Sequence, residues 1–284
     1  MYNPIDIGID SSLIRTGFWS KSWNIPKLGY NICGYSKAAH RTGFYIKDLD
    51  LLLDAGPQNF NHPRHIMITH VHDDHIAELA LTLIPESSQS IPPIVYAVES
   101  AKEYLDIITH KKPYVFKGIT VNNDFMCNMN KKSILVHPVK CEHGVNIDTI
   151  SFCFSEIKQK LKLEYRDLKG HEIKKLKDDK IQITEPINKP LFAFICDTSI
   201  NIFTDHPEIL QYPVIFIECT FLYDGEQMNA VKTNHIHWDH IKPIIIQNPN
   251  IIFMLFHFSM RYKDDKTIRD FFITQNIDNV YCWA

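Results

Sequence analysis

The stretch His70-Val71-His72-Asp73-Asp74-His75 decides the fold, because its three histidines and Asp74 are potential metal ligands. It follows a β-rich run, and in an extended chain His70 and His72 face the same side. Asp74 and His75 then face a second position, about one metal–metal spacing away. Neutral imidazole and carboxylate are zinc ligands, and a catalytic zinc keeps one position open for water. The alternative is a polar surface turn, but histidine is a rare residue, so the pattern predicts a metallohydrolase site.

Short runs rich in Ile, Val, Leu and Phe recur along the chain, and each ends abruptly in an ionisable side chain. Runs of this composition, bounded by turn residues, are typical of buried strands. The residues that follow or end these runs are Asp54, His70, His143, Asp197, Glu218 and His257. Strands that all deliver ionisable groups predict one site at one edge of a sheet sandwich. Helical patterns lie between the strands, at residues 76–81, 101–108 and 168–176.

A second match to the HxHxDH pattern lies at His235-Ile236-His237-Trp238-Asp239-His240. It follows the polar stretch 227–234 rather than a buried strand, and of the strand-end ligands only His257 comes after it. The metals are therefore expected on the first copy. His237 and His240 are expected to be structural or solvent-facing.

The composition is ordinary for a soluble globular protein, with 284 residues, 45% hydrophobic residues and a net charge of −3. We expect one domain over residues 1–284, with a basic surface excursion at about 156–185. Residues 156–180 carry nine Lys or Arg against six Asp or Glu, a local charge of +3. This is the local basic patch that RNA binding would require in a chain without a global basic field. The alternative is a solvated helical face.

The amino-terminal residues Met1–Asp6 show no basic stretch followed by an apolar run, so they do not resemble a secretory signal. No apolar stretch approaches the roughly 20 residues that span a bilayer. The seven cysteines are an odd number without a CxxC pair, which is typical of reduced thiols. We therefore expect an intracellular protein, cytoplasmic or nuclear, with no membrane partner.

The motifs, taken in order from about residue 25 to 262, resemble ribonuclease Z, the tRNA 3′-processing endonuclease, in its short plant-type form. The matching metal-site pieces are His70–His75, Glu142-His143-Gly144 and Asp197-Thr198. The pieces more specific to this family are Glu218-Cys219-Thr220-Phe221, His235-Ile236-His237 and His257-Phe258-Ser259-Met260-Arg261-Tyr262. Similarity also covers residues 162–170 and Glu172-Ile173. The resemblance implies the metallo-β-lactamase fold, an α/β four-layer αββα sandwich.

The resemblance also implies a role for each matching residue. It implies a first zinc on His70, His72 and His143, a second on Asp74, His75 and His257, and Asp197 as the bridge. Asp74 would also orient the attacking water. His235, held by Glu218, would protonate the leaving 3′ oxygen, a task that suits a histidine near its ordinary pKa. Histidine and aspartate ligands also suit manganese or iron.

The implied substrate is precursor tRNA, cut to a tRNA with a 3′-hydroxyl and a trailer with a 5′-phosphate. The implied assembly is a homodimer in which one subunit's arm grips the RNA that the other cleaves. Candidate RNA-binding residues are Lys162, Arg166, Lys169, Lys174, Lys175 and Arg261. Two alternatives stay open: a di-zinc phosphodiesterase acting on other RNA or small phosphodiesters, and a non-catalytic, metal-stabilised module that binds RNA or protein.

Three further expectations concern single positions. The sequence has Asn234 where the family usually has a glycine before the first His of the His-x-His motif, and Asn tolerates a left-handed backbone better than most residues. The Gly-Pro-rich flexible arm of bacterial forms is not evident. Asp54 ends a predicted strand and is expected to fix a ligand imidazole.

Overall fold

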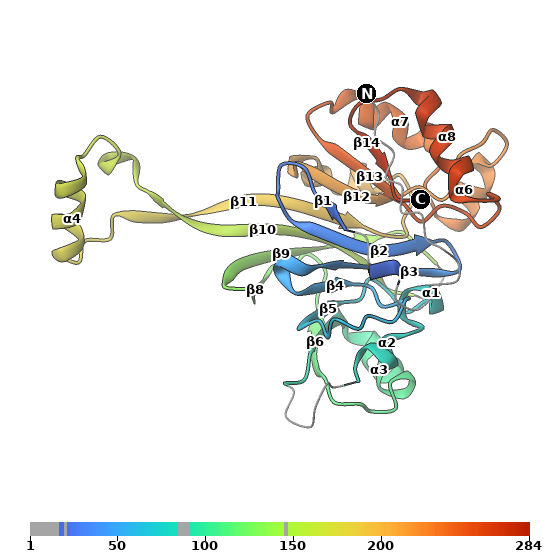
Figure 1. Ribbon diagram of the computed structural model, residues 1–284, viewed down its shortest axis with the longest axis horizontal. Helices are drawn as coiled ribbons and strands as arrows, with labels where there is room; N and C mark the ends of the chain where they lie inside the picture. Colours follow the sequence, from blue (N-terminus) through green and yellow to red (C-terminus); the bar gives the residue numbers. More distant parts are fainter. Residues whose placement is uncertain (1–16, 20–21, 85–90, 145–146) are drawn as a thin grey trace.

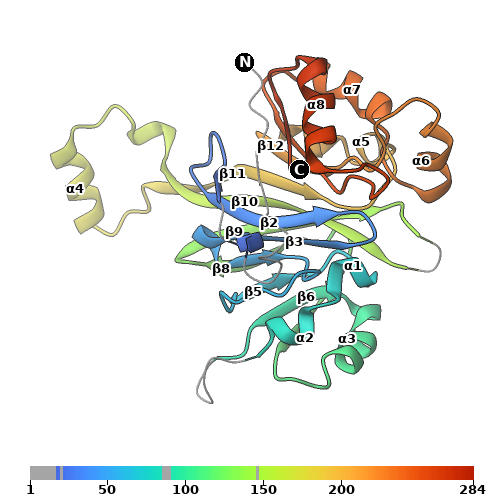
Figure 2. The same cartoon turned by 45° about the vertical axis from the view of Figure 1, so that its right-hand side comes forward.

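The computed structural model describes residues 17–19, 22–84, 91–144 and 147–284. The stretch Met1–Asp6, considered above for a targeting signal, lies outside these ranges. Two seven-stranded mixed sheets pack face to face, and helices cover the outer side of each sheet (Figures 1 and 2). The predicted four-layer αββα sandwich is confirmed. None of the described helices is long and apolar enough to cross a membrane.

The first sheet holds the amino-terminal half of the described chain. Its strands, in spatial and chain order, are β1 (Trp23–Asn24), β2 (Asn31–Lys37), β3 (Arg41–Ile46), β4 (Leu51–Leu53), β5 (His65–Met67), β6 (Ile94–Val98) and β7 (Val115–Ile119). Strands β1 to β4 pair antiparallel, and β4 to β7 pair parallel. Three helices lie in the crossovers of the parallel part: α1 (Asp73–Ile76), α2 (Leu79–Thr82) and α3 (Lys102–Ile108).

The second sheet mirrors this arrangement. Its strands, in chain order, are β8 (Phe125–Met129), β9 (Lys132–Cys141), β10 (Thr149–Leu161), β11 (Thr184–Ile195), β12 (Val214–Glu218), β13 (Ile252–Phe256) and β14 (Val280–Cys282). Strands β8 to β11 pair antiparallel, and β11 to β14 pair parallel. Its outer face carries α5 (Ile202–Asp205), α6 (Gln227–Thr233), α7 (Trp238–Gln247) and α8 (Asp265–Gln275).

The main apolar core lies between the two sheets and is rich in aromatic rings. Phe44 of β3 packs edge-on against Phe194 of β11 and Phe256 of β13, with ring centroids 5.9 and 5.2 Å apart. Phe194 and Phe256 stack on each other at 5.3 Å. Offset and edge-to-face contacts of this kind add to the gain from burying the rings. The packing fixes the two sheets at the positions from which their strand ends meet.

Strands β10 and β11 continue beyond the body of the sandwich as a two-stranded arm, with α4 (Gly170–Asp178) at its tip (Figure 1). The pairing runs out to Leu161 opposite Thr184. None of the residues of α4 is buried. The residues of this helix therefore lie on the surface, and the helical pattern at 168–176 corresponds to α4. The sequence did not predict the long hairpin that carries this helix.

The helical pattern at 76–81 is interrupted in the structure. Helix α1 ends at Ile76 and α2 begins at Leu79, because the chain between them bonds to the segment after β4. The Ala55 amide donates to the carbonyl of His75 at 2.7 Å, and the Glu78 amide donates to the carbonyl of Ala55 at 3.1 Å. These tertiary bonds replace a continuous helical ladder and hold α1 against the end of β4.

Gly56 offers a test of this docking, because a Cβ atom there would lie 2.1 Å from the carbonyl oxygen of Asp74 and 2.5 Å from the amide nitrogen of Thr42. We expect Gly56→Ala to push α1 away from the sheet and to destabilise the protein by about 1–3 kcal/mol, as overpacking usually does. Thermal unfolding measures the loss. Gly170→Ala is the matched control, since a Cβ there would meet nothing within 4 Å. Equal melting temperatures for the two variants would contradict the expectation.

Candidate metal centre

Ionisable side chains from both sheets meet at one edge of the sandwich, where parallel strands end. His70, His72, Asp74 and His75 follow β5 of the first sheet, whereas Asp197 and His257 follow β11 and β13 of the second. His143 follows β9. The predicted convergence of strand ends is therefore present, and it joins residues that lie far apart in the sequence.

The first group consists of His70, His72, His143 and Asp197, whose potential ligand atoms all lie within 4.8 Å of one another. His72 Nδ1 lies 2.9 Å from His70 Nε2 and 3.2 Å from His143 Nε2. Atoms that surround an ion at 2.0–2.1 Å are themselves about 3–3.5 Å apart, so the spacing fits a zinc-sized ion.

The second group consists of Asp74, His75 and His257, again within 4.8 Å of one another. Asp74 Oδ2 lies 3.5 Å from His75 Nε2 and 3.4 Å from His257 Nε2. Asp197 touches both groups: its Oδ2 is 3.6 Å from His70 Nε2, and its Oδ1 is 3.3 Å from His257 Nε2. Asp197 therefore lies where a carboxylate bridging two ions would lie.

One orphaned atom supports the fit to a metal. His75 Nε2 is buried and has no hydrogen-bond partner among the described residues, yet it faces the carboxylates of Asp74 and Asp197, each 3.5 Å away. A buried polar atom without a partner is costly unless something else satisfies it. An ion held by these oxygens and this nitrogen would do so.

In the first group, the electrostatics favour the forms that bind metal. Burial lowers the pKa of the His70 imidazole well below its ordinary value, and neighbouring His75 lowers it further. Burial also lowers the pKa of His72 and of His143. Burial would raise the pKa of Asp197, but His257 and His75 more than offset this and hold it well below its usual range. Neutral imidazoles and an ionised carboxylate are the ligand states that zinc requires.

The comparisons with known proteins agree with this geometry. The chain is 29% identical over 248 residues to tRNase Z TRZ1 of Arabidopsis thaliana, covering 82% of this chain and 87% of the relative. The human short-form tRNase Z superposes with a TM-score of 0.55, covering 88% of this chain and 94% of that one at 15% identity. The Bacillus subtilis metallo-β-lactamase fold protein YhfI gives a TM-score of 0.59 at 13% identity, covering 88% of this chain and 93% of that one. The chain has the metallo-β-lactamase fold.

The resemblance to ribonuclease Z is likewise confirmed, since the similarity to a tRNase Z runs over most of both chains. No protein-family model matches the chain. The metallo-β-lactamase fold explains why the site lies between the sheets, at the edge where each half of the sandwich presents strand ends.

Asp54 makes the contact expected of it, since His75 Nδ1 lies 2.9 Å from Asp54 Oδ2. Asp54 is fully buried and has a left-handed backbone, with φ 58°. It also accepts from the amide of Thr69 at 2.8 Å and from the Thr69 hydroxyl at 3.0 Å. The carboxylate therefore fixes the ring that carries the orphaned Nε2 atom.

Glu218 and His235 form a second carboxylate–imidazole pair beside the cluster. Glu218 is fully buried at the end of β12, and its Oε1 lies 2.8 Å from His235 Nδ1. Burial would lower the pKa of His235, but the Glu218 carboxylate outweighs it and raises the pKa to about 9. Potential ligand atoms of His235, Asp197 and His257 also lie within 4.8 Å of one another, which makes a further potential ligand group.

Asn234 has the left-handed backbone that its position before His235 was expected to need, with φ 51°, and it caps the end of α6. His237 is buried and structural: its Nδ1 accepts from the Asp239 amide at 3.0 Å, and its Nε2 donates to the carbonyl of Tyr223 at 3.0 Å. Within the described chain, neither His237 nor His240 belongs to a potential metal-binding group. The contacts of His237 agree with a structural role.

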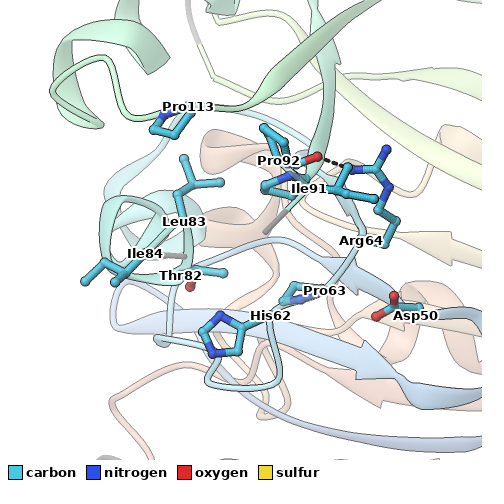
Figure 3. Close-up of a pocket in the computed structure, with 11 residues that line it drawn as sticks. Asp50, His62, Pro63, Arg64, Thr82, Leu83, Ile84, Ile91, Pro92 and Pro113 are labelled. Carbon is cyan, nitrogen blue, oxygen red and sulfur yellow. Dashed lines mark hydrogen bonds between the residues drawn. The ribbon is translucent and has the colours of Figure 1, made fainter. Parts of the chain in front are cut away.

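A hollow of about 410 Å³ lies over the cluster, and His72, Asp74, His143, His235 and His257 line it. A separate cavity of about 320 Å³ lies at the opposite edge of the first sheet, before β5 and β6 (Figure 3). Its wall is built from prolines and aliphatic side chains around Arg64, and it contains none of the residues of the two metal-binding groups. The hollow over the cluster, and not this cavity, is therefore the candidate active site.

The candidate RNA-binding residues fall into two places. Lys162, Arg166, Lys169, Lys174 and Lys175 lie on the arm between β10 and the start of β11, whereas Asp197 of the cluster follows the end of β11. Arg261 lies at the hollow itself, with its guanidinium carbon 5.5 Å from the centre of the Phe221 ring. The arm and the hollow are thus separate surfaces of the same chain.

Sequence reasoning assigned no role to two threonines and one backbone amide that contact the cluster. Thr69 precedes His70, and Thr220 lies in the Glu-x-Thr-Phe motif. Both threonines thus lie within recognised motifs, but the sequence does not show which side chains their hydroxyls contact. The amide of Ala39, in the turn between β2 and β3, donates to Asp74 Oδ2 at 2.9 Å. No signal in the sequence marks that contact, because it depends on how a hairpin turn reaches the site.

We expect Asp54→Asn to weaken zinc binding about 10–100-fold, as loss of a partner behind a ligand imidazole usually does. The amide that replaces the carboxylate cannot hold the His75 ring as strongly. Competition with a chromophoric chelator measures the affinity. Asp73→Asn is the matched control, because this neighbouring carboxylate is exposed. An unchanged affinity in Asp54→Asn would show that Asp54 does not support the site.

Proposed function

We propose that this chain is a metal-dependent endoribonuclease that removes the 3′ trailer from precursor tRNA. The products would be a tRNA with a 3′-hydroxyl and a trailer with a 5′-phosphate. The observation that carries the proposal is the Glu218–His235 pair beside the two metal-binding groups, since His235 lines the same hollow as Asp74. The relatives named tRNase Z support the choice of precursor tRNA as the substrate.

The ligand set we propose is His70, His72 and His143 for one ion and Asp74, His75 and His257 for the other, with Asp197 between them. The spacing within each group and the orphaned His75 nitrogen support it. Zinc, or manganese in its place, would supply an activated water at neutral pH and neutralise charge on the phosphodiester.

The chain's own residues would orient the reactants and move one proton. Asp74 is held by the Ala39 amide, so its carboxylate is placed to orient the attacking water. Glu218 accepts from His235 Nδ1, which leaves His235 Nε2 to donate a proton to the leaving 3′ oxygen. The negative charge of Glu218 stabilises the protonated ring until transfer.

The arm supplies the local positive charge that RNA binding requires. Its α4 helix presents Lys174, Lys175 and Lys177 to solvent, and the arm points away from the body of the sandwich (Figures 1 and 2). An arm directed outward fits a homodimer in which the arm of one subunit holds RNA cleaved by the other.

Substrate identity is tested by offering the zinc-loaded protein a precursor tRNA and, separately, bis(p-nitrophenyl) phosphate. We expect cleavage of the precursor after the discriminator nucleotide. We expect Asp74→Ala to lower kcat/KM on both substrates by about 10²–10³-fold or more, because it loses a ligand and the group that orients water.

The outcomes separate the proposal from its alternatives. Cleavage of the ester alone would leave a phosphodiesterase for other RNA or small esters. No turnover of either substrate would leave a metal-stabilised binding module. Full activity in Asp74→Ala would contradict the mechanism while keeping the substrate.

We expect simultaneous change of Lys169, Lys174 and Lys175 to alanine to raise KM for precursor tRNA and leave kcat for the ester unchanged. Each lost phosphate contact should reduce the slope of log affinity against log salt by about 0.7–0.9. Binding of labelled precursor to the Asp74→Ala protein, measured over a range of salt, gives this slope. Lys266→Ala on α8 is the control for loss of a surface charge away from the arm.

Mixing the arm variant with Asp74→Ala tests the dimer. If the arm acts on the partner subunit, mixed dimers pair an intact arm with an intact site, so at low concentrations of precursor tRNA the mixture cleaves faster than either variant alone. An unchanged salt slope would remove the arm from the RNA site, and absence of this faster cleavage would remove the action between subunits.

A further inference from the structure

Two buried carboxylates flank the cluster, one from each sheet, and they are built in the same way. Asp54 accepts from the Thr69 amide at 2.8 Å, from the Thr69 hydroxyl at 3.0 Å and from His75 Nδ1 at 2.9 Å. Glu218 accepts from the Thr220 amide at 3.0 Å, from the Thr220 hydroxyl at 2.8 Å and from His235 Nδ1 at 2.8 Å. Each carboxylate thus accepts hydrogen bonds from the amide and the hydroxyl of one threonine and from one imidazole.

Each threonine hydroxyl also meets a second imidazole. Thr69 Oγ1 lies 3.0 Å from His70 Nδ1, and Thr220 Oγ1 lies 3.1 Å from His257 Nδ1. A hydroxyl has one proton, and an ionised carboxylate can only accept, so the threonine donates to the carboxylate. Its oxygen then accepts from the Nδ1–H of the histidine. This fixes the tautomer of His70 and His257 and leaves Nε2 of each ring free to face the cluster.

The two arrangements, each of one carboxylate, one threonine and two histidines, differ in the histidine that bonds directly to the carboxylate. On the Asp54 side it is His75, a potential metal ligand, so Thr69 lies between two ligands. On the Glu218 side it is His235, the proposed proton donor. Thr220 Oγ1 is 3.3 Å from His235 Nδ1 as well. The Thr220 hydroxyl is therefore in reach of the carboxylate, the proton donor and a metal ligand at once.

We infer that Thr220 is a positioning residue that ties the metal ligand His257 to the Glu218–His235 pair. One hydroxyl thereby sets both the orientation of a ligand ring and the placement of the proton donor. The inference rests on the proposed function for the part that concerns His235. The part that concerns His257 stands on metal binding alone.

Among the hydrogen bonds of the described residues, Thr220 Oγ1 is the acceptor for His257 Nδ1, whereas His235 Nδ1 is also held by Glu218. Thr220 is buried, and its carbonyl accepts from the Ser259 amide at 3.0 Å, which joins its loop to the loop after β13. His257 has a left-handed backbone, φ 66°, that a non-glycine residue adopts only when its surroundings hold it there. Removing the hydroxyl would leave a buried His257 Nδ1–H without this acceptor, a loss that is costly in a protein interior.

The experiment compares Thr220→Val with Thr69→Val, since valine keeps the shape of threonine without its hydroxyl, and adds Thr220→Ser, which keeps the hydroxyl. The first readout is zinc affinity without substrate, by competition with a chelator, on variants shown by circular dichroism to be folded. We expect both valine variants to bind zinc about 10–100-fold more weakly than the unaltered protein. Thr220→Ser should recover affinity to within about threefold, because it restores the acceptor.

The second readout is turnover at saturating zinc on precursor tRNA and on bis(p-nitrophenyl) phosphate, whose leaving group departs without a proton. Thr69→Val should lose activity by the same factor on both substrates, so its tRNA-to-ester rate ratio should equal that of the unaltered protein. Thr220→Val should lose about tenfold or more further on the tRNA than on the ester, because it also misplaces the proton donor.

The result that would overturn the inference is zinc affinity in Thr220→Val equal to that of the unaltered protein, or a tRNA-to-ester rate ratio equal to that of Thr69→Val. Failure of the proposed function is recognised separately, because the unaltered protein would then not cleave precursor tRNA. In that event the zinc affinities still decide whether Thr220 supports His257, and the link to His235 falls.

Discussion

The buried carboxylate of Asp197 is the group on which the rest of the site depends. It is 2% exposed and lies between 3.3 and 3.6 Å from the Nε2 atoms of four histidines. A carboxylate in such a place is unstable unless opposite charge or hydrogen bonds compensate it. The strands that end here therefore have to place imidazoles around this carboxylate. Two packed sheets are needed to place them on both sides of it.

The need to orient those imidazoles explains the side chains that lie behind them. A ring whose Nε2 faces the cluster must have its Nδ1 proton accepted from behind. Asp54 and Glu218 supply this directly, and Thr69 and Thr220 extend it to a second ring on each side. The two halves of the sandwich meet the same requirement with the same pair of residue types. They differ in one respect: the imidazole that Glu218 holds in the second half, His235, is not part of the proposed ligand set.

The sequence was sufficient for those features that are encoded locally. Buried runs of Ile, Val and Phe ending in an ionisable residue predicted β5, β12 and β13, because strand composition and strand ends are local properties. The left-handed backbone of Asn234 was expected instead from the resemblance, which places a glycine there, and Asn234 adopts it. The partner of Thr220 could not be predicted, since it is 37 residues away, and the choice among several histidines depends on how two loops pack.

The arm was only partly predictable, and the reason is physical. The outer halves of β10 and β11 contact no core, so their residues lack the alternation of apolar and polar side chains that marks a strand. Their pairing depends on backbone bonds to each other and on the inner halves, which enter the sheet and are buried. A basic, polar sequence can therefore be held far from the body by strands that begin in the core. The arm is thereby separated from the buried, tightly bonded cluster, because its outer residues contact neither the core nor the ligands.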